Sequence, residues 1–168
     1  MGLFDLLKQK REQKQLERLQ KQLEIQQEKE RLALHRQYLK EVRNPRNNYQ
    51  KNVRKIETKW SVMNNMKDFG GQRGKEFEKL CIQNIDDLRK YVEIEVKYKK
   101  ELPTKAPAFK RLAMLYEKWK EYEKAASVCR MYLQLGMRPE KMDSRMVRMI
   151  KKAGRTPTEE ELKIIDKL

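Results

Sequence analysis

The sequence contains little glycine, proline, cysteine or histidine, and each scarcity narrows the range of folds and functions. Among 168 residues there are 6 glycines and 5 prolines, so turns are few and long helices are expected. The two cysteines, Cys81 and Cys129, form no Cys-x-x-Cys pair, and the single histidine, His35, is remote from both. This spacing gives no support to a zinc site. Both cysteines lie on apolar helix faces, so we expect buried free thiols in a reducing cytoplasm.

Long apolar runs are also missing. No run approaches the roughly 20 residues that a membrane-spanning helix needs. The start, MGLFDLLKQKR, contains too short an apolar segment for a secretory signal. Leu6 stands where the myristoylation pattern requires Ser or Thr. We therefore expect a cytoplasmic protein.

Catalytic signatures are absent from the sequence. Gly74-Lys75 looks like the end of a phosphate-binding loop, but Phe69 stands where that motif needs glycine. Glu76 follows where the motif needs Ser or Thr, so a glycine hinge is the preferred interpretation. The chain shows no nucleophile–base pair, metal cluster or cofactor motif. We predict that the protein is not an enzyme and holds no cofactor or metal.

Positive charge is abundant. Lysine and arginine number 41 against 25 aspartates and glutamates, a formal net charge of +16. The excess lies in residues 1–60 and 106–168, and residues 61–105 are nearly neutral. Such a balance favours an anionic partner, which could be nucleic acid, a membrane surface or an acidic protein. A soluble, self-repelling surface explains the charge equally well.

The periodicity of apolar residues predicts an all-α protein in three segments. These are a long basic helix over 1–44, a second helix with a glycine-rich hinge over 45–74, and a helical domain over 75–168. Asn44-Pro45 is expected to break the first helix, because the residue before a proline is driven out of the helical region. Further helices are expected over 49–67, 75–101 and 140–153. Thr156 is expected to cap the last helix, with Glu159 completing a capping box.

The first helix carries two apolar features. Leucines and isoleucines at heptad-like spacing give either a short coiled coil that makes a homo-oligomer or a single solvated helix, and both interpretations stay open. They are Leu16, Leu19, Leu23, Ile25, Leu32 and Leu39. Apolar residues at the start suggest either peripheral contact with a membrane interface or a docked helix end. They are Leu3, Phe4, Leu6 and Leu7.

Residues 106–139 form the most informative stretch. Ala113 and Ala125 would allow two helix backbones to approach closely, with Tyr116 filling the groove beside them. The residues at the spacing of a 34-residue helix–turn–helix unit are Phe109, Leu112, Ala113, Tyr116, Tyr122, Ala125, Leu133 and Leu135. This pattern resembles a single tetratricopeptide repeat (TPR). An ordinary helical hairpin with the same spacing is the alternative.

The stretch also departs from the TPR pattern. The turn at 118–121 lacks the usual glycine, Cys129 replaces an aromatic residue, and the closing proline is displaced to Pro139. Tyr132 replaces a small residue, which predicts that the next helix packs at a different angle. One repeat cannot bury its own faces, so the helices at 75–101 and 140–153 are expected to cover it.

The resemblance implies a protein-binding adaptor or scaffold. The inner surface of such repeats comes from the first helix of each repeat. Carried over to this sequence, the partner-binding candidates are Lys110, Arg111, Met114, Glu117 and Lys118. A solvated helix face is the alternative interpretation of these residues.

Nucleic-acid binding through basic helices is the competing function. Tyr38, Tyr49 and Trp60 are interleaved with basic residues and could stack on bases, although core contacts explain Tyr38 and Trp60 more simply. No sequence-specific binding motif accompanies them. The anion-binding candidates are Arg36, Lys40, Arg43, Arg46, Lys51, Arg54, Lys55, Lys59, Arg145, Arg148, Lys152 and Arg155.

Overall fold

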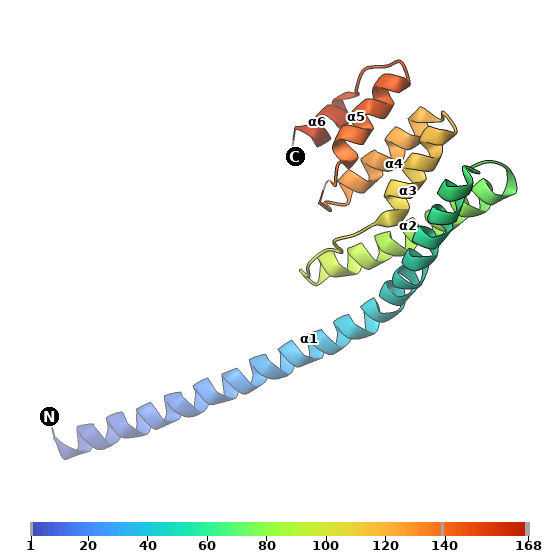
Figure 1. The fold of residues 1–168 in the computed structure, drawn as a ribbon. Helices are drawn as coiled ribbons and strands as arrows, with labels where there is room; N and C mark the ends of the chain where they lie inside the picture. Colours follow the sequence, from blue (N-terminus) through green and yellow to red (C-terminus); the bar gives the residue numbers. More distant parts are fainter. Residues whose placement is uncertain (1, 139, 167–168) are drawn as a thin grey trace. The chain divides into compact units, whose positions relative to one another are not determined.

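The computed structural model describes residues 2–138 and 140–166, and only the backbone of Leu3. It confirms an all-α fold (Figure 1). The chain divides into two compact units, Met1–Glu41 and Val42–Leu168. Residues 45–74, expected as a separate segment, lie within the second unit. The helices are α1 (Leu3–Met66), α2 (Gly71–Lys97), α3 (Pro107–Lys118), α4 (Tyr122–Gln134), α5 (Met142–Lys152) and α6 (Glu159–Ile165).

The first unit consists of the α1 residues up to Glu41. Ion pairs and hydrogen bonds between neighbouring turns support the helix, for example from Arg31 Nη2 to Glu28 Oε1 at 2.7 Å. The leucines and isoleucines at heptad-like spacing, from Leu16 to Leu39, are exposed. Self-association through this face stays a prediction.

Phe4 is 87% exposed, and Leu6 and Leu7 are also exposed. The side chain of Leu3 lies outside the described residues. Peripheral membrane contact by this end stays a prediction. Within residues 2–138 and 140–166, every helix is too short or too polar to cross a lipid bilayer.

The expected break at Asn44-Pro45 is wrong, because α1 runs through Pro45 without ending. Proline lacks the N–H of a helical hydrogen bond and disfavours the helix interior by about 3 kcal/mol. Packing beyond the proline offsets this cost. Tyr49, Ile56 and Trp60 are buried in the core of the second unit. In addition, Asn84 Nδ2 of α2 donates a 2.9 Å hydrogen bond to the Tyr49 carbonyl.

The core contains the apolar stripes predicted for residues 49–67 and 75–101. Ile56, Trp60 and Met63 of α1 belong to the same buried cluster as Phe77 and Leu88 of α2. Cys81 and Cys129 are both buried free thiols, as predicted. Burial raises the pKa of the Cys129 thiol to about 12, so this thiol is protonated and unreactive at neutral pH.

Of the three glycines expected to form the hinge after α1, only Gly74 is tightly packed, because a Cβ on Gly70 or Gly71 would meet open space. A Cβ on Gly74 would lie 2.3 Å from the Phe69 carbonyl oxygen and 2.8 Å from Trp119 Cζ2, so no side chain fits there. Trp119 Nε1 donates a 2.6 Å hydrogen bond to that same carbonyl. The turn after α3 is therefore held against the turn between α1 and α2.

Helices α3 and α4 form the predicted hairpin, and α2 and α5 cover it as expected (Figure 1). Ala113 and Ala125 are fully buried, and Tyr116 is 6% exposed. Tyr132 packs edge-on against Phe109 with ring centroids 5.5 Å apart. Whether this hairpin is a TPR stays a prediction, and its closing Pro139 lies outside the described residues.

Helix α5 buries its apolar face, whereas α6 differs from the prediction both in its cap and in its apolar side. Met142, Met146, Met149 and Ile150 of α5 are buried. The capping box uses Thr158 and Glu161 in place of Thr156 and Glu159. With the cap at Thr158, Glu161 is the third residue of the helix, and its carboxylate accepts hydrogen bonds from the Arg155 guanidinium. In α6, Ile164 and Ile165 pack against the core, but Leu162 is 46% exposed.

Three helices end with a lysine in the left-handed conformation, at Lys67, Lys99 and Lys120. After α3, the N–H groups of Lys120 and Glu121 donate to the carbonyls of Glu117 and Tyr116, which is a Schellman motif. Glycine is the favoured residue at this position because it has no Cβ. Lys120 therefore lies at the position of the 118–121 turn where the TPR pattern usually has glycine.

We expect Lys120→Gly to raise the free energy of unfolding by about 1 kcal/mol, because the φ of +61° at this exposed position disfavours a side chain. Urea denaturation followed by circular dichroism measures the change. Lys110→Gly, at an exposed position inside α3, is the control and should destabilise by about 1 kcal/mol. Equal destabilisation by both substitutions would contradict the role given to Lys120.

Candidate functional site

A basic groove lies between α3 and α5. Its volume is about 470 Å³. Five cationic side chains and one carboxylate line it, together with one apolar and one aromatic residue. We call this set the α3–α5 groove: Met114, Glu117, Lys118, Lys120, Tyr122, Arg145, Arg148 and Lys152.

Glu117 is the centre of charge pairing in the groove. Its Oε2 accepts from Arg145 Nη1 at 2.8 Å and from Arg148 Nη2 at 3.2 Å, and its Oε1 accepts from Lys152 Nζ at 2.8 Å. The Lys152 ammonium also lies 5.5 Å from the centroid of the Tyr122 ring. One carboxylate of α3 thus holds three cations of α5 in position.

The Glu117 carboxyl remains ionised at neutral pH. Burial acts to raise its pKa, but the hydrogen bond from Lys152 and the charges of Arg148, Lys152 and Arg145 outweigh burial and lower the pKa. Since three cations share one anion, the groove keeps an excess of positive charge. Arg148 and Lys152 remain about half exposed and can contact a further anion.

The groove unites two sets of residues that the sequence analysis kept apart. Three of the partner-binding candidates, Met114, Glu117 and Lys118, meet three of the anion-binding candidates from α5. The remaining two partner-binding candidates do not line the groove. Lys110 is exposed elsewhere on α3.

Arg111, the fifth partner-binding candidate, is engaged within the fold. Its Nε and Nη2 donate to the two carboxylate oxygens of Glu57 at 3.0 and 2.7 Å. Its guanidinium lies 5.3 Å from the Trp60 ring centroid. A bidentate pair stacked on an aromatic ring is a stable arrangement, so Arg111 serves to join α3 to α1.

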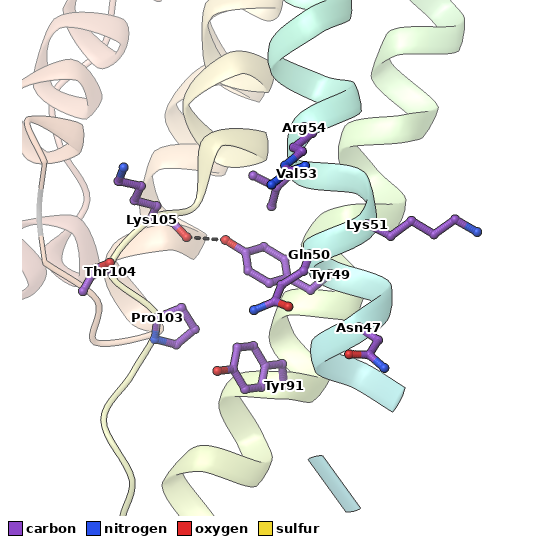
Figure 2. Close-up of a pocket in the computed structure, with 10 residues that line it drawn as sticks. All are labelled: Asn47, Tyr49, Gln50, Lys51, Val53, Arg54, Tyr91, Pro103, Thr104 and Lys105. Atoms are coloured by element: carbon purple, nitrogen blue, oxygen red, sulfur yellow. Dashed lines mark hydrogen bonds between the residues drawn. The ribbon is translucent and has the colours of Figure 1, made fainter. Parts of the chain in front are cut away.

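A second pocket lies where α1, α2 and the segment before α3 meet (Figure 2). Its volume is about 1000 Å³. Tyr49 of α1 and Tyr91 of α2 both project toward the 103–105 segment, and the Tyr49 hydroxyl donates to the Lys105 carbonyl (Figure 2). We call this the Tyr91 pocket, lined by Asn47, Tyr49, Gln50, Lys51, Val53, Arg54, Tyr91, Pro103, Thr104 and Lys105.

Tyr91 is oriented by its neighbours. Its ring centroid is 6.0 Å from that of Tyr49, and the Arg46 guanidinium lies 5.5 Å from its centroid. Arg46 in turn pairs with Glu95, whose side chain is 2% exposed, at 3.3 Å. Burial is the main cause of a raised Tyr91 pKa, so the phenol stays neutral at physiological pH.

The predicted basic and aromatic residues of α1 separate into different roles. Lys51 and Arg54 line the Tyr91 pocket, and Arg46 is paired with Glu95. Trp60 is buried in the core of the second unit, as predicted, and Tyr49 is buried there as well. Tyr38 is also buried, but it is not part of that core cluster. The other anion-binding candidates in α1 are exposed: Arg36 and Lys40 in the first unit, and Arg43, Lys55 and Lys59 in the second.

Arg155, predicted as an anion-binding residue, joins α4 to α6. Its guanidinium donates to both oxygens of Glu123, at 2.6 and 3.1 Å, and to both oxygens of Glu161, at 2.8 Å each. Glu161 is 1% exposed and also accepts from the Thr158 N–H at 2.8 Å. The Arg155 hydrogen bonds lower the pKa of Glu161 to about 2.

Sequence reasoning missed several residues of both sites. Lys120 and Tyr122 of the groove flank the α3–α4 turn, and their closeness in sequence to Lys118 was the available signal. Tyr91 and Lys105 of the pocket gave a weaker signal, because one borders an apolar stripe and the other lies in a linker.

The Glu161 pKa predicts a pH dependence of stability. Because the folded pKa of about 2 lies below the ordinary value of 4.5, ionised Glu161 stabilises the fold above about pH 4.5, and this contribution is lost as the pH falls toward 2. We expect Glu161→Gln to lower the free energy of unfolding by about 2 kcal/mol at pH 7, and by much less near pH 2. Urea denaturation across this pH range measures the difference.

Glu160→Gln is the matched control, since Glu160 is exposed on the same helix turn. It should change stability little at either pH. A Glu161→Gln deficit that stays constant from pH 7 to pH 2 would contradict the assignment.

Comparison with protein-family models, with curated proteins and with solved structures finds no match to this chain. The geometry of the α3–α5 groove and of the Tyr91 pocket is therefore the basis for a functional proposal.

Proposed function

We propose that the protein is a non-enzymatic, protein-binding adaptor whose TPR-like helical domain binds an acidic segment of a partner protein in the α3–α5 groove. The observation that supports this proposal best is the convergence of Arg145, Arg148 and Lys152 on the single carboxylate of Glu117. The basic first helix would add charge or self-association to this function.

The pairing to Glu117 prepares the groove for a carboxylate. Holding a long cationic side chain in one conformation costs entropy. Because Arg148 and Lys152 are already held by Glu117, less entropy is lost when a ligand binds them. Lys118 and Lys120 add exposed ammonium groups at the same site. An incoming glutamate or aspartate side chain would meet several donors at once, with guanidinium groups suited to bidentate contacts.

The apolar part of the groove favours a peptide over a free anion. Met114 is half-buried at the core surface, and Tyr122 is half-buried beneath Lys152. Methionine adapts to varied apolar side chains, and tyrosine combines an apolar ring with a polar end. A short segment that alternates acidic and apolar residues would satisfy both kinds of surface.

We expect Arg148→Ala with Lys152→Ala to weaken binding of a fluorescein-labelled octaglutamate peptide by about five- to thirty-fold. Each exposed charge pair contributes on the order of 0.5–1 kcal/mol, and two are removed. Arg145 is kept so that Glu117 retains a partner. Fluorescence anisotropy at low and moderate salt measures the affinity, and salt should weaken binding.

Lys75→Ala with Lys79→Ala is the control, because it removes the same charge from exposed positions of α2. It should change the affinity less than about twofold. If both double variants lose affinity equally, the peptide responds to overall charge and the groove is not its site. Retained affinity in the groove variant would also reject the proposal.

A further inference from the structure

We propose that the Tyr91 pocket binds a nucleotide unit, with the base stacked on the Tyr91 ring and the phosphate held by Arg54 and Lys105. The proposal concerns a different surface from the α3–α5 groove and does not depend on the function assigned to that groove. Its volume of about 1000 Å³ is at the upper end of the range of ligand sites, roughly 300–1000 Å³, and can hold a base, a sugar and a phosphate.

The Tyr91 ring is held in place by neighbouring side chains without a ligand. Arg46 lies against the Tyr91 ring and is itself paired with the buried Glu95. Tyr91 is half-buried and lines the pocket, so the ring also presents surface to a ligand. A flat base can stack on a tyrosine held in this way, since stacking needs an accessible ring and little else.

The walls of the pocket are fixed to one another. The Tyr49 hydroxyl bonds the Lys105 carbonyl and thereby ties the 103–105 segment to α1 (Figure 2). The buried Asn84 side chain holds the Tyr49 backbone to α2. Three separate parts of the chain therefore keep a constant spacing around the Tyr91 ring.

Two exposed amide side chains line the same pocket. Asn47 and Gln50 each carry an amide donor and an amide oxygen acceptor, the groups that recognise the edges of bases. Gln50 lies between Tyr49 and Tyr91 in Figure 2, where it can reach the edge of a base stacked on Tyr91.

The charge of the pocket differs from that of the groove. Lys51, Arg54 and Lys105 are exposed, and no carboxylate occurs among the described lining residues. In Figure 2, Lys105 extends away from Tyr91 at one rim of the pocket, whereas Lys51 points away on the opposite side of α1. A phosphate attached to a base stacked on Tyr91 would emerge near this rim, where guanidinium and ammonium groups attract it.

A stacked base has to be unpaired, so the pocket fits a single strand or a free nucleotide and not a duplex. The test uses fluorescein-labelled oligo(dT) and oligo(U) of 15 nucleotides, the matching oligo(dT)–oligo(dA) duplex, and thymidine monophosphate as competitor. The full chain is used, and fluorescence anisotropy is measured over a range of salt concentrations.

We expect the single strands to bind more tightly than the duplex. Tyr91→Leu should weaken single-strand binding by about five- to a hundred-fold, because the stacked base is lost. Tyr91→Phe should keep the affinity within about twofold, since the ring remains. Arg54→Ala with Lys105→Ala should reduce the slope of log affinity against log salt by about 1.4.

Lys75→Ala with Lys79→Ala again controls for overall charge and should leave the Tyr91 effect intact. Competition by thymidine monophosphate would identify a free nucleotide as the ligand, and its absence would identify a single strand. Equal binding of the duplex, no effect of Tyr91→Leu, or equal losses in the two alanine pairs would each overturn the proposal. The exposed Arg54 and Lys105 positions keep the test decisive even if Tyr91→Leu fails to fold.

Discussion

The packing of residues 42–168 depends on ion pairs made by two charged side chains of the 12-residue helix α3, Arg111 and Glu117. One face of this helix is apolar and enters the core, so its charged residues lie at the boundary with neighbouring helices. Arg111 pairs with Glu57 and stacks on Trp60 of α1, whereas Glu117 pairs with three cations of α5. A half-buried charge left without a partner costs more than an exposed one, so these pairs fix which helices lie beside α3.

The same pairing decides which cations remain for a ligand. Arg46, Arg111 and Arg155 each contact a carboxylate through a guanidinium and belong to the fold. Arg54, Lys105 and Lys118 are lining residues without that role. The total of 41 lysines and arginines therefore overstates the number of cations available to a ligand, because several arginines are paired within the fold. Arginine suits such internal pairing because its planar guanidinium matches the two oxygens of a carboxylate.

Periodicity was sufficient to predict the helical class, the buried stripes and the hairpin, because each depends on residues close in sequence. The helices α2 and α5 were also identified correctly as covers of the hairpin. Prediction failed where distant contacts decide. Local preference favoured a break at Pro45, but the packing of Tyr49 and Ile56 beyond it sustains the helix. The cap of α6 is a different case, because the sequence offers a Thr-x-x-Glu pattern at both 156–159 and 158–161, and the structure uses the second, in which Glu161 also meets Arg155. Both sites join segments far apart in sequence, and only their individual residues could be proposed in advance.

The two sites should prefer different anions because only one contains its own carboxylate. In the α3–α5 groove an incoming anion must share Arg148 and Lys152 with Glu117, whose lowered pKa keeps it ionised at neutral pH. A single negative charge gains little from such sharing, so the groove favours ligands with several carboxylates that also reach Lys118 and Lys120. In the Tyr91 pocket no described lining residue competes for Arg54 or Lys105, and one phosphate suffices. Glu117 in one site, and no carboxylate among the described lining residues of the other, would therefore separate the ligands proposed for the two sites.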